Sequence, residues 1–281
     1  MSEPLNLESV LSQVGNQEKE YDWLGAAESY KKALVLMPRQ DFSKLGEIHE
    51  RLGYASYRAA MQAESREKFK DRMCRGVADY EKAKEFYGRL SEPGKEARVL
   101  RCDAMIAFMG YWLASEVPEK KRLVNECWTL AKESLKSFEQ AADALEYGKT
   151  YNQRSSSVVF EFCLEWNFQA REKMMKEAVE RGEQAIKFLS ALEDIRELAR
   201  AYARTAFYLS VFDYFFLDAA ERDKERQKAQ DYWQKAGELC EDVALFELLY
   251  PVFGAQLLLW GDGSEEALTN LKKALEYGRK T

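Results

Sequence analysis

Asp22-Trp-Leu-Gly-Ala-Ala-Glu-Ser-Tyr-Lys-Lys-Ala-Leu-Val-Leu-Met-Pro38 is the stretch that decides the fold. Ala26, Tyr30 and Ala33 recur at helical spacing and share one face. Pro38 stands where the helix must stop, because proline has no backbone N–H and its ring clashes with the preceding turn. Small residues allow the backbone of a neighbouring helix to approach, while the tyrosine fills the gap beside them. The stretch therefore predicts one helix packed closely against other helices.

The order of residue types in this stretch is that of a known repeat family. An aspartate and an aromatic residue, then Ala, an aromatic residue and Ala at steps of four and three, then proline, resemble the second helix of a tetratricopeptide repeat (TPR). Leu52-Gly-Tyr-Ala55 resembles the first-helix signature of the same family. The resemblance implies an interaction scaffold of antiparallel helix pairs. It names no partner, because the Lys and Asn set of co-chaperone TPR domains has no counterpart at the matching positions.

An internal period near fifty residues indicates helix pairs that are longer than a standard TPR unit. Ala83, the best match to the second-helix alanine, comes late after Gly53, so we expect about two extra turns in each helix at 3.6 residues per turn. The period is marked by residues that begin long apolar runs: Arg51, Arg101, Arg154, Arg204 and Gly254.

The second helices align on a face of alanine and bulky side chains. The aligned sets are Ala26, Tyr30 and Ala33; Ala83, Tyr87 and Leu90; Ala131, Leu135 and Phe138; Ala185, Leu189 and Leu192; Ala229, Trp233 and Ala236; and Ala267, Leu271 and Ala274. They predict one TPR-like domain over residues 1–281, with units at about 5–38, 43–92, 94–140, 148–192, 194–240 and 242–279. The predicted fold is all-α: a right-handed α-solenoid of about six antiparallel helix pairs, a TPR-like superhelix whose first helices form the concave face.

Composition narrows the class of partner. Charged residues make up 32% of the chain with both signs interspersed, and the formal net charge is -6. Nucleic-acid binders usually carry a basic face, so we expect no nucleic-acid partner. The apolar run 244–260 contains Glu247, Pro251 and Gln256 and falls short of the roughly 20 apolar residues of a membrane span. We therefore expect no membrane partner either.

Cysteine usage and the N-terminus indicate a cytoplasmic protein. The segment 1–6 is polar and no apolar core follows it, so no signal peptide is expected. The cysteines are odd in number and widely spaced, without a Cys-x-x-Cys pair, which favours reduced core thiols over disulfides or metal. They are Cys74, Cys102, Cys127, Cys163 and Cys240.

Signatures of catalysis are mostly missing. His49 is the one histidine, which excludes metal triads and His-activated nucleophiles as ordinary options, and we expect it on the surface or in a groove. Gly261-Asp-Gly-Ser264 follows no strand and lacks the Gly-Lys-Ser/Thr ending of a phosphate loop, which favours a helix-hairpin turn. We predict no catalytic, cofactor or metal site. An enzyme that uses buried Arg and Glu side chains stays as a third class.

Charges inside the apolar runs allow two interpretations. Arg154, Glu161 and Glu165 follow at steps of seven and four residues, which predicts one helical face. Buried charges cost several kcal/mol unless they are paired. These side chains therefore either pair between neighbouring helices or line a hydrated groove. The aromatic series of 202–216 likewise predicts core packing, with its tyrosine hydroxyls as an alternative rim of a peptide groove.

Function is predicted from the position of side chains on the first helices. The groove candidates are Tyr54, Tyr57, Arg58, Arg154, Glu161, Glu165, Tyr208 and Asp213. We expect a non-catalytic scaffold that binds a protein or peptide on the concave face. The alternative is a regulatory module of a larger protein that senses a ligand or signalling peptide. Homo-oligomers formed through the solenoid ends are also compatible with the sequence.

Overall fold

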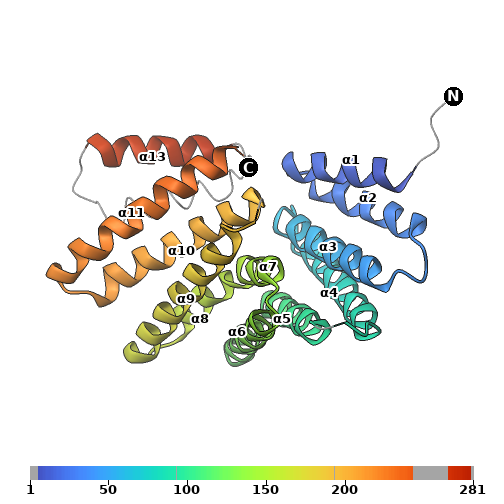
Figure 1. The fold of residues 1–281 in the computed structure, drawn as a ribbon, viewed down its shortest axis with the longest axis horizontal. Helices are drawn as coiled ribbons and strands as arrows, with labels where there is room; N and C mark the ends of the chain where they lie inside the picture. Colours follow the sequence, from blue (N-terminus) through green and yellow to red (C-terminus); the bar gives the residue numbers. More distant parts are fainter. Residues whose placement is uncertain (1–5, 93, 193, 243–264, 280–281) are drawn as a thin grey trace. The chain divides into compact units, whose positions relative to one another are not determined.

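The computed structural model describes residues 6–92, 94–192, 194–242 and 265–279 (Figure 1). Within these ranges the fold is all-α, with twelve helices and no strand, and consecutive helices pack against one another from α1 to α6 and from α7 to α11. The prediction of an all-α helical-repeat array is thereby confirmed. The first helix of the last predicted unit, with Gly254 and the turn at 261–264, lies outside the described residues. No helix of the described part combines the length and apolar character needed to cross a bilayer.

The chain forms two compact units, residues 1–142 and 143–281. The first unit contains three helix pairs joined by short turns. Its helices are α1 (Leu7–Lys19), α2 (Trp23–Leu36), α3 (Phe42–Met61), α4 (Arg66–Gly88), α5 (Lys95–Leu113) and α6 (Val117–Gln140).

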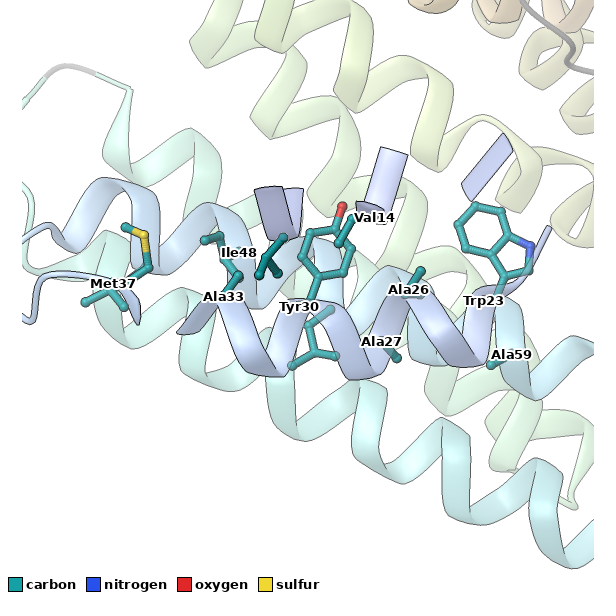
Figure 2. Close-up of a cluster of buried hydrophobic side chains, with 13 residues drawn as sticks. Val14, Trp23, Ala26, Ala27, Tyr30, Ala33, Met37, Ile48 and Ala59 are labelled. Carbon is teal, nitrogen blue, oxygen red and sulfur yellow. The ribbon is translucent and has the colours of Figure 1, made fainter. Parts of the chain in front are cut away.

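The predicted opening helix is α2. The Asp22 carboxylate accepts a hydrogen bond from the Gly25 N–H at 2.9 Å and caps its N-terminus. The helix ends at Leu36, two residues before Pro38. The face of alanines and tyrosine is buried in a cluster that α1 and α3 complete, and Figure 2 shows Tyr30 beside Val14 and Ile48. The expected close packing of this helix is confirmed.

The longer middle helices are also present. Helices α3 and α4 have 20 and 23 residues, against 13 and 14 in α1 and α2. The difference amounts to about two additional turns in each helix. The late position of Ala83 in the sequence therefore reflects helix extension, as expected.

The second unit contains an interrupted first helix. Its helices are α7 (Ala144–Arg154), α8 (Ser156–Leu164), α9 (Phe168–Leu189), α10 (Ile195–Phe216), α11 (Ala219–Asp242) and α13 (Glu265–Gly278). Ser155 separates α7 from α8, although its own φ of -54° and ψ of -32° remain helical. Helix α8 ends at Leu164, and Glu165 is extended, with φ -90° and ψ 130°. The predicted single helical face of Arg154, Glu161 and Glu165 is wrong, because the chain turns toward α9 at Glu165.

The period near fifty is 51 residues in the structure. The second helices α4, α6, α9 and α11 begin at Arg66, Val117, Phe168 and Ala219, each 51 residues after the previous one. Buried small residues recur with this spacing on the first helices, at Gly46, Ala97, Gly148 and Ala199. A Cβ atom on Gly46 would lie 2.6 Å from the Tyr87 ring, and one on Gly148 would lie 2.6 Å from Leu189. Tyr87 and Leu189 are themselves 102 residues apart, two periods of 51.

This register corrects three alignments made from the sequence. Ala236 is equivalent to Ala185, whereas the sequence alignment matched Ala229 to Ala185 and so placed α11 two turns out of step. Phe138 is equivalent to Tyr87, whereas the sequence alignment matched Leu135 to Tyr87 and so placed α6 one turn out of step. Arg101 is equivalent to Glu50 rather than to Arg51. The errors in the second helices arise because helix faces repeat every three or four residues, so a shift of whole turns preserves the apolar pattern. The Arg101 error is a shift of one residue, made by matching arginine to arginine.

Candidate functional site

Helix α3 leaves one stripe of side chains accessible to solvent. Its residues are spaced by three and four positions, which places them on one side of the helix. The three members in the N-terminal half of the helix, Lys44, Glu47 and Arg51, are all charged. We call this set the α3 stripe: Lys44, Glu47, Arg51, Tyr54, Arg58 and Met61.

Two predicted groove residues, Tyr54 and Arg58, form the anchor of the α3 stripe. Arg58 Nη1 donates a hydrogen bond to the Tyr54 hydroxyl at 3.1 Å. The Arg58 guanidinium carbon lies 4.5 Å from the ring centroid of Trp23, which comes from α2. Trp23 and Tyr54 meet edge to face at 5.8 Å. A cation over an aromatic face is favourable by about 0.5–2 kcal/mol, so the guanidinium is held in place.

Tyr57, the third predicted residue in this unit, continues the aromatic contacts toward α5. Its ring lies 6.1 Å from that of Tyr54 and 5.9 Å from that of Phe108. Phe108 in turn meets Trp112 at 6.4 Å. The structure thus brings the three predicted residues of α3 together and adds Trp23, Phe108 and Trp112. The 51-residue step from Tyr57 to Phe108 is the sequence signal that could have found Phe108.

A buried ion pair lies among the helices α3, α4 and α5. Arg101 Nη2 is 2.8 Å from Glu50 Oε2, and the Tyr87 hydroxyl donates to the same oxygen at 3.0 Å. Burial, and then the nearby Glu50 carboxylate, raise the pKa of Tyr87 well above its usual value. The carboxylate therefore has two donors inside the unit. This cluster fixes α3 relative to its neighbours.

His49 is not a surface residue, contrary to the sequence-based expectation. It is buried, stacks on Phe86 with ring centroids 5.5 Å apart, and its Nδ1 lies 3.2 Å from an Asp79 oxygen. Its position one turn before the Leu52-Gly53 pair places it where α4 covers α3. None of the five cysteines, all of them within the described residues, forms a disulfide. Cys102, Cys127 and Cys240 are buried, as expected, but Cys74 and Cys163 are exposed, so these two are not core thiols.

In the second unit, three predicted groove residues are inside. Arg154, Tyr208 and Asp213 are all buried. The Tyr208 hydroxyl donates to the carbonyl oxygen of Ser155, at the interruption between α7 and α8. Arg154 Nη2 donates to Gln153 Oε1 at 3.1 Å. These three side chains therefore lie inside the second unit.

Polar side chains around Tyr208 form a network that ties α7 to α9 and α10. The Tyr151 hydroxyl lies 3.3 Å from Thr205 Oγ1 and donates to the Ala178 carbonyl at 3.4 Å. Thr205 Oγ1 donates to the Ala201 carbonyl at 2.7 Å. Burial raises the pKa of Tyr208 to about 12. The Tyr208 hydroxyl therefore stays protonated, and remains a hydrogen-bond donor, at pH values above the ordinary tyrosine pKa of 10.0.

A second polar cluster joins α7 to the first turn of α10. Asn152 Nδ2 donates to Glu197 Oε2 at 2.8 Å, and Arg200 Nη1 lies 2.7 Å from Glu197 Oε1. Burial alone would raise the pKa of Glu197. The charge of Arg200 and the hydrogen bonds from Asn152 and Arg200 outweigh burial and lower that pKa below its ordinary value. The carboxylate is therefore held in its ionised form.

Glu165 organises a turn instead of lining a groove. Its Oε1 accepts hydrogen bonds from the backbone N–H groups of Trp166 and Asn167, at 2.8 and 2.9 Å. Glu161, in α8, is half-buried. The turn leaves the Trp166 side chain exposed, and the end of α10 exposes Tyr214 and Phe215. The expectation that the aromatic series 202–216 is core therefore fails at its C-terminal end.

The described residues offer no obvious metal site. Among them, no three His, Cys, Asp or Glu side chains gather as a metal ion would require. The polar side chains that meet are engaged with one another or with backbone groups in the contacts given above. Two surfaces stand out among the described residues: the charged and aromatic α3 stripe, and the exposed aromatic rings at one end of the second unit.

Comparisons with known proteins add little. No family model matches the chain, and no curated protein matches it. Similar solved structures include the crystal structure of BtubC (BKLC) from P. vanneervenii, with a TM-score of 0.45, 16% identity and coverage of 84% of this chain and 80% of that one. Another comes from the computational design of self-assembling cyclic protein homo-oligomers, with a TM-score of 0.37, 12% identity and coverage of 84% and 96%. Similarities at this level carry no argument about function.

Proposed function

We propose that this chain is a non-catalytic, TPR-like scaffold that binds a protein or peptide segment along the α3 stripe. The observation that carries the proposal is the position of Arg58 against Trp23 and Tyr54, at one end of a row of charged side chains. Tyr and Arg are enriched among the energetically dominant residues of protein interfaces, and the buried Trp23 ring supports the Arg58 guanidinium from beneath. A segment on this stripe would meet an aromatic and arginine anchor at one end and charged side chains along the rest.

The anchor is pre-organised. Arg58 is fixed by the Tyr54 hydroxyl and the Trp23 ring, so little side-chain freedom is lost when a partner binds. Beneath α3, the buried Glu50–Arg101 pair ties the helix to α5. A rigid surface of this kind favours binding without rearrangement.

The dimensions of the α3 stripe suit a peptide segment. From Lys44 to Met61 the helix runs about 25 Å, at a rise of 1.5 Å per residue. An extended segment of about seven or eight residues has this length, at about 3.3 Å per residue. The partner we propose is such a segment, with a carboxylate placed to meet Arg58 because a guanidinium binds carboxylates with two parallel hydrogen bonds.

Site-specific photo-crosslinking in cells tests this proposal. A photo-reactive phenylalanine analogue replaces Met61, an exposed residue of the α3 stripe, so that Tyr54 and Arg58 stay in place; in a matched control it replaces Lys82, an exposed residue of α4. We expect a defined protein adduct from position 61 that disappears when Arg58→Gln is added, and no such adduct from position 82. The same adducts from both positions, or an adduct that Arg58→Gln leaves unchanged, would contradict the proposal. The alternative of a ligand-sensing module in a larger protein has no specific support among the contacts described.

A further inference from the structure

The second unit carries an exposed aromatic surface, which we call the aromatic tip and define by Trp166, Phe168, Tyr214 and Phe215. The first two come from the α8–α9 connection and the start of α9, and the other two from the last turn of α10 (Figure 1). Their exposed fractions are 87%, 59%, 52% and 49%. Every other aromatic side chain whose burial the structure describes is buried or half-buried. Exposure of aromatic rings is thus confined to one place among these residues.

Three of the four rings of the aromatic tip, those of Phe168, Tyr214 and Phe215, are joined through ring contacts, and Trp166 lies two residues before Phe168 in the chain. Phe216 lies beneath it and meets Phe168 with ring centroids 4.9 Å apart. Phe162 of α8 contacts Phe215 at 5.7 Å, and Phe215 contacts Tyr214 at 4.9 Å. These contacts join α8, α9 and α10 at the same end of the unit. The exposed rings therefore rest on a packed aromatic base.

The size of the tip limits the kind of partner. An aromatic side chain buries about 200 Å² when it is fully covered, so the exposed fractions sum to roughly 500 Å². This value is at the upper end of the largest apolar patches on monomers, which are often functional. It is smaller than the roughly 800 Å² that each partner contributes to a standard protein interface. A short segment fits this surface better than a whole domain.

The turn that displays Trp166 is fixed by hydrogen bonds. Glu165 Oε1 holds the N–H groups of Trp166 and Asn167, and Asn167 Oδ1 accepts from the Ala170 N–H at 2.9 Å to cap α9. Arg171 Nε donates to the Glu165 carbonyl. These bonds order the backbone that carries Trp166 before a partner binds, which lowers the entropy cost of docking.

The charges around the tip favour a cationic partner. Among the flanking residues whose burial the structure describes, Glu172, Asp218 and Glu221 are exposed carboxylates, and Lys173 and Lys176 are exposed cations. The neighbouring Arg171 is already engaged, with its guanidinium carbon 4.8 Å from the Phe162 ring centroid. The chain itself therefore shows how a guanidinium rests on these rings. Acidic neighbours also disfavour an anionic lipid surface.

We propose that the aromatic tip docks a short peptide segment of a partner protein in which apolar side chains alternate with Arg or Lys. The apolar side chains cover Trp166 and Phe215, and the cations stack on ring faces and meet the surrounding carboxylates. This site belongs to the second unit and is independent of the α3 stripe. An experiment can therefore contradict the proposal for one site without affecting the proposal for the other.

The test measures fluorescence anisotropy of labelled twelve-residue peptides titrated with the full chain. One peptide alternates Leu and Arg, a second alternates Leu and Glu, and a third alternates Ser and Arg. We expect the Leu/Arg peptide to bind at least ten-fold more tightly than either of the others. The double variant Trp166→Ser and Tyr214→Ser should weaken that binding at least ten-fold. Both side chains are exposed, so the variant should keep the wild-type melting temperature.

The matched control is Val117→Ser, which removes another exposed apolar side chain at a helix start, in the first unit. It should bind the Leu/Arg peptide as wild type does, and so should Tyr54→Phe, which separates this proposal from the one for the α3 stripe. Equal affinity for the Leu/Arg and Leu/Glu peptides, or an unchanged affinity in the double variant, would overturn the proposal. If no peptide binds but the chain is retained on anionic vesicles through Trp166, the proposal is overturned in favour of a membrane surface. If no peptide binds but light scattering shows concentration-dependent dimers that require Trp166, it is overturned in favour of a second copy of the chain.

Discussion

Glu50 of α3 and Arg101 of α5 occupy equivalent positions in successive helix pairs, 51 residues apart, and form a buried ion pair at 2.8 Å. Tyr57 and Phe108 show the same relationship, also 51 residues apart, with ring centroids at 5.9 Å. Equivalent residues of α3 and α5 therefore contact each other across these two first helices. In a stack of repeats, such contacts between neighbouring units supply much of the stability.

Loss of one partner of the Glu50–Arg101 pair should destabilise the fold strongly. Arg101→Ala leaves a buried carboxylate without its cation, and we expect the free energy of unfolding to fall by about 3–5 kcal/mol. The exposed Arg122, which pairs with Glu119 and Glu126, is the control, and Arg122→Ala should cost less than about 1 kcal/mol. Urea denaturation followed by circular dichroism measures both. Similar losses for the two variants would show that Arg101 is not a buried structural cation.

Gly53 should not tolerate a methyl group. A Cβ atom there would lie 2.5 Å from the Tyr80 ring and 3.1 Å from the Gly76 carbonyl oxygen, where α3 crosses α4. We expect Gly53→Ala to lower the free energy of unfolding by about 1–3 kcal/mol through overpacking. Gly15, in the interior of α1, has no neighbouring atom within 4 Å of the added Cβ, so Gly15→Ala should raise stability by up to about 1 kcal/mol. Equal melting temperatures for the two variants would contradict the close crossing of these helices.

Glu197 should make stability depend on acid pH. Its pKa is lower in the folded state than its ordinary value of 4.5, so the unfolded chain binds more protons at acid pH. This contribution to stability is present above about pH 4.5 and is lost as pH falls through the folded-state pKa. We expect the urea midpoint to decrease below pH 4.5, and to decrease less steeply in Glu197→Gln.

The cause of this pKa shift can be tested separately. Arg200→Gln removes the nearest cation from Glu197 and should flatten the acid dependence in the same direction. A profile in Arg200→Gln as steep as that of wild type would assign the shift to other groups. Stability at pH 7 should also fall in both variants, because the ion pair is partly shielded from solvent.

Tyr208→Phe distinguishes an interior tyrosine from a groove tyrosine. The variant removes the side-chain donor to the buried Ser155 carbonyl, which keeps the hydrogen bond from the Val158 N–H, and we expect a loss of about 0.5–1.5 kcal/mol in the free energy of unfolding. The exposed Tyr214 is the control, and Tyr214→Phe should change stability by less than about 0.5 kcal/mol. A Tyr208→Phe variant with wild-type stability would place this hydroxyl outside the structural network.

Several features of the fold followed directly from the sequence. The α2 boundaries were readable because Asp22 and Pro38 act on their immediate neighbours in the chain. The longer middle helices were readable because no proline interrupts 59–77 and the spacing between Gly53 and Ala83 requires extra turns. The period near fifty was visible, but its value of 51 and its register were not, because a shift of one turn leaves the apolar pattern unchanged.

The candidate site was only partly predictable. Tyr54, Tyr57 and Arg58 come together as expected, since they lie within one turn of a single continuous helix. Glu165 left the expected face because a turn begins there, and its own carboxylate stabilises that turn. Trp166 could not be predicted as exposed, because it lies in a short connection between helices, where the sequence has no helical period to show which side chains face solvent.

The sequence by itself determined that this chain forms paired helices of two lengths, because propensity, caps, proline and apolar spacing act over a few neighbouring residues. Only the tertiary structure decided which charged and aromatic side chains are inside. Arg154 is covered although it is charged, and Trp166 is exposed although it is a large aromatic residue. The physical reason is that burial of a helix face depends on the helix that covers it, and within each unit that helix comes from a distant part of the chain.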